Sequence, residues 1–179
     1  KRRVLGVIRP TTEIVGNYSK TGHVGILATL GTVKSESYVI EIAKFFPELK
    51  VFQQACPMWV PLVENNEHEG PGADYFVEKY LHELLNQCSD IDTIVLGCTH
   101  YPLLIRKIRQ YLPESVQVIS QGEIVAKSLV EYLQRHPEIE AVCSKHSQTN
   151  YFTTESALGF DEHAAIFMGE RVQSKHLPL

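Results

Sequence analysis

The sequence predicts an α/β fold with a mostly parallel sheet flanked by helices. Short apolar strands alternate along the chain with amphipathic helices, which is typical of βαβ units joined by right-handed crossovers. Residues 93–96 are apolar and β-branched without alternation, as expected of a strand covered on both faces. These two patterns together favour an open, mostly parallel α/β sheet.

Each predicted element follows from its local pattern. The predicted strands are residues 4–8, 23–28, 49–52, 93–96 and 116–119. Apolar residues recurring every three or four positions predict helices at 12–18, 38–46, 73–86, 103–112 and 123–134. Residues 56–64 are predicted to be an apolar loop or short helix. In the helix 103–112 we expect Leu104, Ile108 and Leu112 to face inward and Arg106, Lys107 and Arg109 to face outward.

The regular alternation fades beyond residue 135. Residues 141–143 and 151–154 are predicted strands, and the last residues are predicted to form a loose tail. We therefore place a domain boundary near Gln121, with an α/β domain at 1–120 and a further segment at 121–179. Because the chain starts at Lys1 rather than Met and enters an apolar stretch at once, we expect it to be a piece of a longer protein.

The composition excludes several classes of function. The 179 residues are 44% hydrophobic and carry a formal net charge of −4, so nothing attracts nucleic acid or an anionic membrane, and small-molecule partners are favoured. The four cysteines form no CxxC pair, and no signal peptide is recognisable, which predicts a reducing, cytoplasmic location. The glycine spacings match neither nucleotide-binding motifs nor a serine nucleophile elbow.

Cys98 is the strongest candidate for chemistry. A free cysteine is by residue type most often an inert apolar side chain. This one follows a buried strand and the turn at Gly97, and it precedes a helix whose start is indicated by Pro102. Backbone dipoles and a nearby imidazolium at such a position would stabilise the thiolate. The other three cysteines, Cys56, Cys88 and Cys143, are predicted to be structural.

Four polar residues are candidates for supporting roles. His100 fits an acid–base group, a helix cap or a metal ligand, and Cys-x-His alone is a poor zinc site, so acid–base work is favoured. Thr29 and Thr32 are placed either to bind a carboxylate or to cap the next helix, with Thr32 as the expected N-cap. Glu64 is either the first exposed residue after an apolar run or a carboxylate held in a cleft. A Cys–His hydrolase or transferase is the rival interpretation from residue types alone.

Residues 95–104, Val-Leu-Gly-Cys-Thr-His-Tyr-Pro-Leu-Leu, closely resemble the glutamate racemases. Segments 6–10, 28–35 and 56–64 resemble the same family in the same order, so the likeness covers most of residues 4–134. Related aspartate racemases usually carry glutamate at the position of His100, and histidine therefore favours glutamate as the substrate.

The resemblance implies a two-base mechanism without PLP, metal or nucleotide, in which two opposed cysteines exchange the α-proton of glutamate. Cys98 matches the base that acts on the L-enantiomer, and His100 and Glu64 match its assisting residues. Thr99, together with Thr29 and Thr32, matches threonines that hold the substrate carboxylates.

The resemblance also implies a cellular setting and a domain arrangement. The family supplies D-glutamate for bacterial peptidoglycan, and we expect a cytoplasmic homodimer in the full-length protein. Residues 1–120 would be the second of two α/β domains, and 121–179 would complete the first.

The family's N-terminal motifs, with the first catalytic cysteine, are absent from this sequence. We therefore expect this chain alone to racemise glutamate little or not at all. Two alternatives stay open: a racemase for aspartate or another amino acid, and a ligand-binding module without catalysis.

Overall fold

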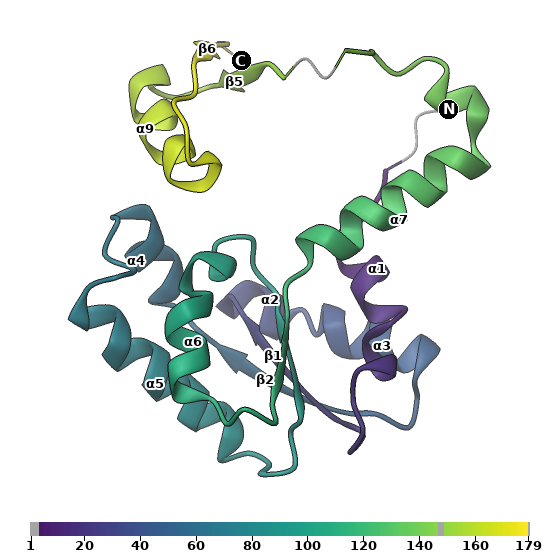
Figure 1. Cartoon of the computed structure of the whole chain (residues 1–179), viewed down its shortest axis with the longest axis vertical. Coiled ribbons are helices and arrows are strands. Elements are labelled where there is room, and N and C mark those ends of the chain that lie inside the picture. The colour runs from purple at the N-terminus through teal and green to yellow at the C-terminus, as the bar shows by residue number, and fades with distance from the viewer. Residues whose placement is uncertain (1–3, 147–148, 179) are drawn as a thin grey trace. The chain divides into compact units, whose positions relative to one another are not determined.

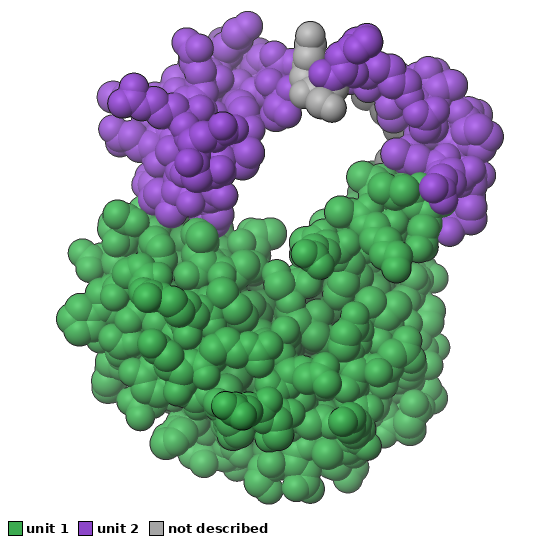
Figure 2. Space-filling view, in the orientation of Figure 1, with its two compact units in different colours: residues 1–132 green, residues 133–179 purple. Residues whose placement is uncertain are grey.

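The computed structural model describes residues 4–146 and 149–178 and divides into two compact units. Unit 1 extends to Tyr132, and unit 2 runs from Leu133 onward (Figure 2). The division falls inside helix α7, Gly122–Arg135, whereas the sequence places a domain boundary near Gln121. The assignment of 1–120 and 121–179 to different domains stays a prediction.

A four-stranded parallel sheet forms the centre of unit 1. Its strands lie in the order β2-β1-β3-β4. The bounds are β1 His23–Ala28, β2 Lys50–Ala55, β3 Thr93–Leu96 and β4 Gln117–Ile119. All of β3 is buried, as the unbroken apolar run predicts, and the α/β class is confirmed.

Helices cover both faces of this sheet (Figure 1). One face carries α4 Trp59–Glu64, α5 Pro71–Leu85, the 3₁₀ turn η2 Tyr101–Leu104 and α6 Ile105–Tyr111. The other carries α1 Ile8–Thr12, the 3₁₀ turn η1 Val15–Asn17 and α3 Ser37–Phe45, with α2 Leu30–Lys34 just before α3. Two apolar cores result, one around Trp59 and Leu84 and one around Tyr38 and Ile42.

The predicted strand at residues 4–8 is wrong, because Ile8 already begins α1. The side chains of Val4, Leu5 and Val7 are exposed, and among the described residues this apolar run pairs with no strand. The helix predicted at 12–18 is also wrong in its bounds. The chain instead leaves α1 and forms η1, where Gly16 lies so close to Phe46 that a Cβ atom would clash with the ring.

The predicted outward orientation of Lys107 is wrong as well. Its side chain is only 8% exposed, and Nζ lies 2.6 Å from Asp74 Oδ1 on α5. The pairing follows from the packing of α5 on α6, which a pattern confined to α6 does not reveal. Leu104, Ile108 and Leu112 are buried as predicted.

Unit 2 contains a small βαβ arrangement. Its elements are α8 Pro137–Glu140, β5 Tyr151–Thr153, α9 Ala157–Met168 and β6 Ser174–His176, and the two strands pair in parallel. The strand predicted at 151–154 is confirmed. The strand predicted at 141–143 is wrong, since these residues form a turn and Val142 is 82% exposed. The tail is not wholly loose, because β6 lies in it.

No helix in the described part of the chain is long and apolar enough to cross a membrane.

Candidate active site

The carboxyl ends of the parallel strands bring the predicted site residues to one edge of the sheet. Gly97 N–H donates to Leu27 O over 2.8 Å, and Cys56 N–H donates to Ala28 O over 2.9 Å, so β1, β2 and β3 end level with one another. Thr29 and Cys98 follow the two central strands, β1 and β3. The strand order reverses between these two, and ligands bind at such a switch point in open α/β sheets.

Gly97 is required by close packing rather than by a special backbone angle. A Cβ atom there would lie 3.1 Å from Ala28 Cβ and from Tyr38 Cε2. The absence of a side chain lets β3 end directly against β1. Cys98 is thereby held beside the carboxyl end of β1.

Cys98, His100 and Glu64 form a continuous chain of polar contacts. Cys98 Sγ lies 3.7 Å from His100 Nδ1, and His100 Nε2 lies 3.2 Å from Glu64 Oε1. Because an ionised carboxylate only accepts, Nε2 carries the proton toward Glu64. In the neutral imidazole, Nδ1 is then the acceptor that faces the thiol. Glu64, at the end of α4, is half-exposed and in contact with His100, and its role stays a prediction.

Burial raises the pKa of the Cys98 thiol above its ordinary value of 9.0. The backbone N–H groups of His100 and Tyr101 oppose this shift, and the negative charge of Glu64 adds to it. The local N–H groups therefore do stabilise the thiolate, as expected. The expected net lowering of the Cys98 pKa is wrong, because burial outweighs these groups. The thiol needs an acceptor such as His100 to lose its proton near neutral pH.

The three predicted threonines lie at the same edge of the sheet. Thr29 is the N-cap of α2 and accepts from Thr32 N–H over 3.4 Å, while their hydroxyls are 3.0 Å apart. The prediction of Thr32 as the N-cap is wrong, because the helix starts one turn earlier, at Leu30. Thr99 is exposed beside Cys98.

A pocket of about 380 Å³ adjoins Cys98 within unit 1. It is mostly apolar and is lined by Val7, Leu96, Cys98, Thr99, Pro102, Ser120, Gln121, Gly122 and Val125. It provides room for a small molecule next to the thiol.

Two residues near the thiol were not predicted from the sequence. Gln121 donates to Leu96 O over 2.9 Å and accepts from the Thr11 hydroxyl over 3.4 Å, which ties β4 to β3 and α1. Burial raises the pKa of Tyr38 to about 12, although a hydrogen bond with Gln121 acts to lower it. The position of Gln121 in the sequence could have indicated its place near the thiol, because it follows the carboxyl end of β4, the strand next to β3.

Fold and side chains together define an α/β protein with a cysteine–histidine pair at the carboxyl edge of its sheet. The chain belongs to the Asp/Glu/Hydantoin racemase family, which matches residues 4–129.

Among its relatives is a glutamate racemase of Streptococcus suis, 36% identical over 176 residues that cover 98% of this chain and 66% of the relative. A crystal structure of a glutamate racemase isoform from Bacillus anthracis is 32% identical, with a TM-score of 0.86 over 98% of this chain and 65% of that one. The Escherichia coli glutamate racemase in complex with L-glutamate and the activator UDP-MurNAc-ala is 28% identical, with a TM-score of 0.73, over 97% of this chain and 62% of that one. The chain thus spans just under two thirds of the length of these relatives.

Proposed function

We propose that this chain supplies the L-glutamate side of a cofactor-independent glutamate racemase. The observation that carries the proposal is the contact chain from Cys98 Sγ through His100 to Glu64 at the carboxyl edge of the sheet. The proposal is supported by the relatives, which are glutamate racemases, one of them in complex with L-glutamate. His100 in place of the glutamate usual in aspartate racemases favours glutamate over aspartate.

The geometry suggests how the first proton moves. His100 Nδ1 accepts the Cys98 proton, while Nε2–H donates to Glu64 and holds the ring in place. The resulting thiolate removes the α-proton of L-glutamate, and the electron pair of the C–H bond passes into the enolate-like α-carbon and carboxylate. Thr29, Thr32 and Thr99 bind the substrate carboxylates, which stabilises this charge.

The proton that completes inversion must arrive on the opposite face of the α-carbon. Cys56 is a poor donor, since it is fully buried and burial raises its pKa well above the ordinary 9.0. Cys88 precedes β3 and so lies at the other edge of the sheet. The opposing acid therefore comes from outside the sheet of unit 1, and this edge alone catalyses α-proton exchange rather than inversion.

Deuterium exchange tests this proposal. The protein is incubated with L-glutamate in deuterated water, and loss of the α-proton is followed by NMR while D-glutamate is measured by chiral chromatography. Replacing the general base, as in Cys98→Ser, is expected to lower the exchange by about 10²- to 10⁴-fold. The exposed Cys143→Ser is the matched control and keeps the exchange rate. Equal exchange in the wild type and Cys98→Ser would refute the proposal.

Substrate choice is measured in the same assay. Exchange from L-aspartate at a rate equal to or above that from L-glutamate would replace glutamate by aspartate as the substrate. Glutamate binding by calorimetry without exchange would instead support a binding module.

Several wider expectations belong to this proposal. They are a role in supplying D-glutamate for peptidoglycan, a cytoplasmic location, and a homodimer without nucleic-acid or membrane partners. The proposed completion of another domain by 121–179 is supported by the apolar side chains that unit 2 exposes, among them Phe152 and Leu158. Light scattering measures the oligomeric state.

A further inference from the structure

A cluster of side chains that could hold a metal ion lies away from the carboxyl edge. His23, Cys88 and Asp90 each place one potential ligand atom within 4.8 Å of those of the other two. It is the one such cluster of histidine, cysteine and acidic residues among residues 4–146 and 149–178. Since His23 begins β1 and Cys88 and Asp90 precede β3, the cluster lies at the amino edge of the sheet. The length of β1, about 20 Å, separates this edge from the carboxyl edge.

We propose that His23, Cys88 and Asp90 bind a divalent zinc ion. An imidazole, a thiolate and a carboxylate are three ligand types that zinc accepts, and a water or a further ligand takes the fourth tetrahedral position. Zn–ligand bonds of about 2.0–2.3 Å place tetrahedral ligands about 3.3–3.8 Å apart. The present separations of 4.8 Å or less need only small side-chain rotations to reach that geometry.

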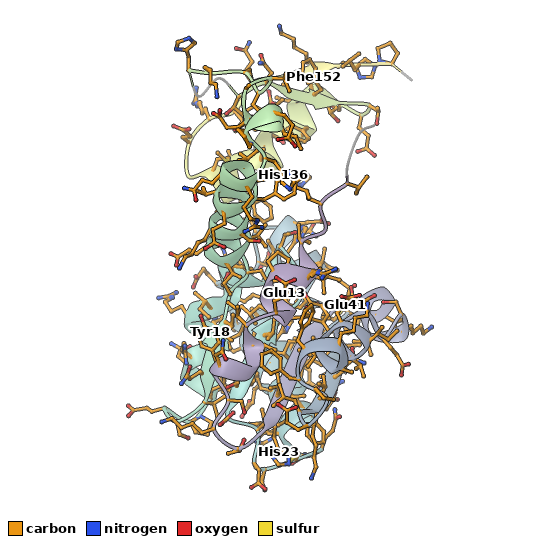
Figure 3. The ribbon with its side chains drawn as sticks, turned by 90° about the vertical axis from the view of Figure 1, so that its right-hand side faces the viewer. Glu13, Tyr18, His23, Glu41, His136 and Phe152 are labelled. Carbon is orange, nitrogen blue, oxygen red and sulfur yellow. The ribbon has the colours of Figure 1, made fainter. Side chains whose placement is uncertain are left out.

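A hydrogen bond to a backbone carbonyl indicates which ring nitrogen of His23 carries the proton. Its Nδ1 lies 2.9 Å from Thr21 O, and because a carbonyl only accepts, Nδ1 carries the proton. The lone pair of the neutral ring is then on Nε2, which is the atom we assign to the metal. Backbone carbonyls fix metal-ligating histidines in this way in known sites. Stacking of the ring on Phe52, with centroids 6.0 Å apart, further restricts its orientation. His23 itself is labelled in Figure 3.

The segment that carries the other two ligands is tied to the start of β1. The Thr21 hydroxyl donates to Asp90 O over 2.8 Å, and Asp92 N–H donates to His23 O over 3.3 Å. These bonds hold the turn before β3 against the turn before β1. The cluster is thus partly preorganised, and the half-buried Cys88 and the exposed Asp90 leave an open path for the ion.

Zinc binding is tested on the whole chain under reducing conditions. Isothermal titration with zinc chloride is expected to give one ion per chain. Titration with cobalt(II) is expected to give thiolate-to-cobalt charge-transfer absorption, and removal of zinc by EDTA should lower the thermal midpoint. Loss of an outer-shell partner alone weakens a metal site about 10- to 100-fold, so His23→Gln and Cys88→Ser should each weaken binding at least tenfold.

Matched controls distinguish this site from others. His82→Gln and Cys143→Ser remove an exposed imidazole and an exposed thiol elsewhere and should keep the zinc affinity. Cys98→Ser should also keep it, because the ion binds at the amino edge. Circular dichroism in EDTA checks that every variant is folded.

The proposal is overturned if zinc does not bind at micromolar to millimolar concentrations, or if folded His23→Gln and Cys88→Ser bind it as the wild type does. Loss of binding in Cys98→Ser with retention in Cys88→Ser would likewise overturn it and place the ion at the carboxyl edge. None of these outcomes depends on racemase activity.

Discussion

The two edges of the unit 1 sheet bring reactive side chains together in different ways. At the carboxyl edge, Cys98 and His100 are two residues apart and come directly after one strand, so the local sequence already places them side by side. At the amino edge, His23 and Cys88 are brought together only by the pairing of β1 with β3. A short motif can therefore be recognised before the fold is known, whereas a cluster formed by strand pairing cannot.

Replacing the thiol at one edge should not affect the other. Cys98→Ser removes the proposed base, so α-proton exchange from L-glutamate should fall by about 10²- to 10⁴-fold. Its zinc affinity should stay at the wild-type value, because β1 separates the two clusters. NMR exchange and zinc calorimetry on the same preparation measure both quantities. A joint loss of exchange and zinc binding would show that the two edges are not independent.

A contact between residues distant in sequence, the ion pair of Lys107 with Asp74, joins α6 to α5. Asp74→Ala leaves the Lys107 ammonium buried without its partner and should lower the free energy of unfolding by about 3 kcal/mol. Urea unfolding measures this loss. The double variant Asp74→Ala with Lys107→Met removes the buried charge and should recover most of it.

The control for this prediction is an exposed pair. Glu13→Ala breaks the contact of Glu13 with Arg9, whose side chains are 41% and 65% exposed, and should cost less than about 1 kcal/mol. Equal losses in Asp74→Ala and Glu13→Ala would contradict a special role for the buried pair.

The sequence predicted the carboxyl edge well because its determinants are local. The apolar run of β3, the glycine at 97 and the following proline are all contiguous, and they place Cys98 at a strand end before a helical turn. The errors have non-local causes. The run at 4–8 is apolar but unpaired, and Lys107 is buried by α5, a helix distant in sequence.

The interpretation of Cys88 illustrates the same limit. Its spacing to Asp90 is visible in the sequence, but a pair of ligands without a third gives no metal site. His23 lies more than sixty positions earlier in the sequence, and only the parallel register of β1 and β3 brings it to that pair. The sign of the Cys98 pKa shift was missed for a similar reason, since burial by surrounding elements outweighs the local N–H groups.

Glu64→Gln separates two effects of this carboxylate: its charge raises the pKa of Cys98, and its contact with His100 holds the imidazole ring. Because the charge of Glu64 raises the pKa of Cys98, its removal should move the rising limb of the exchange–pH profile to lower pH. The weaker hold on His100 should lower the maximum rate by about tenfold, less than loss of an acid–base group. Exchange rates measured from about pH 6 to about pH 10 check both the position of the rising limb and the maximum rate. A profile that moves to higher pH would contradict this electrostatic account.

A small effect is expected at Asp92, which holds the turn at the amino edge. Partial burial raises the pKa of Asp92, but hydrogen bonds from Ser19, Thr21, Lys20 and Thr93 outweigh it and lower the pKa to about 2. A lowered pKa stabilises the fold above the unfolded value near 3.9, and this stability is lost as the pH falls toward about 2. Screening by solvent limits the contribution to about 1 kcal/mol.

Asp92→Asn should therefore lower the free energy of unfolding at pH 7 by that amount and flatten its decrease between about pH 4 and 2. Urea unfolding at a series of pH values, in EDTA so that no metal contributes, measures the slope. The exposed Asp90→Asn is measured alongside as the control. If Asp92→Asn leaves the slope of the unfolding free energy against pH unchanged, backbone hydrogen bonds alone hold the turns before β1 and β3. The placement of the proposed zinc ligands would then follow from strand pairing without help from the Asp92 carboxylate.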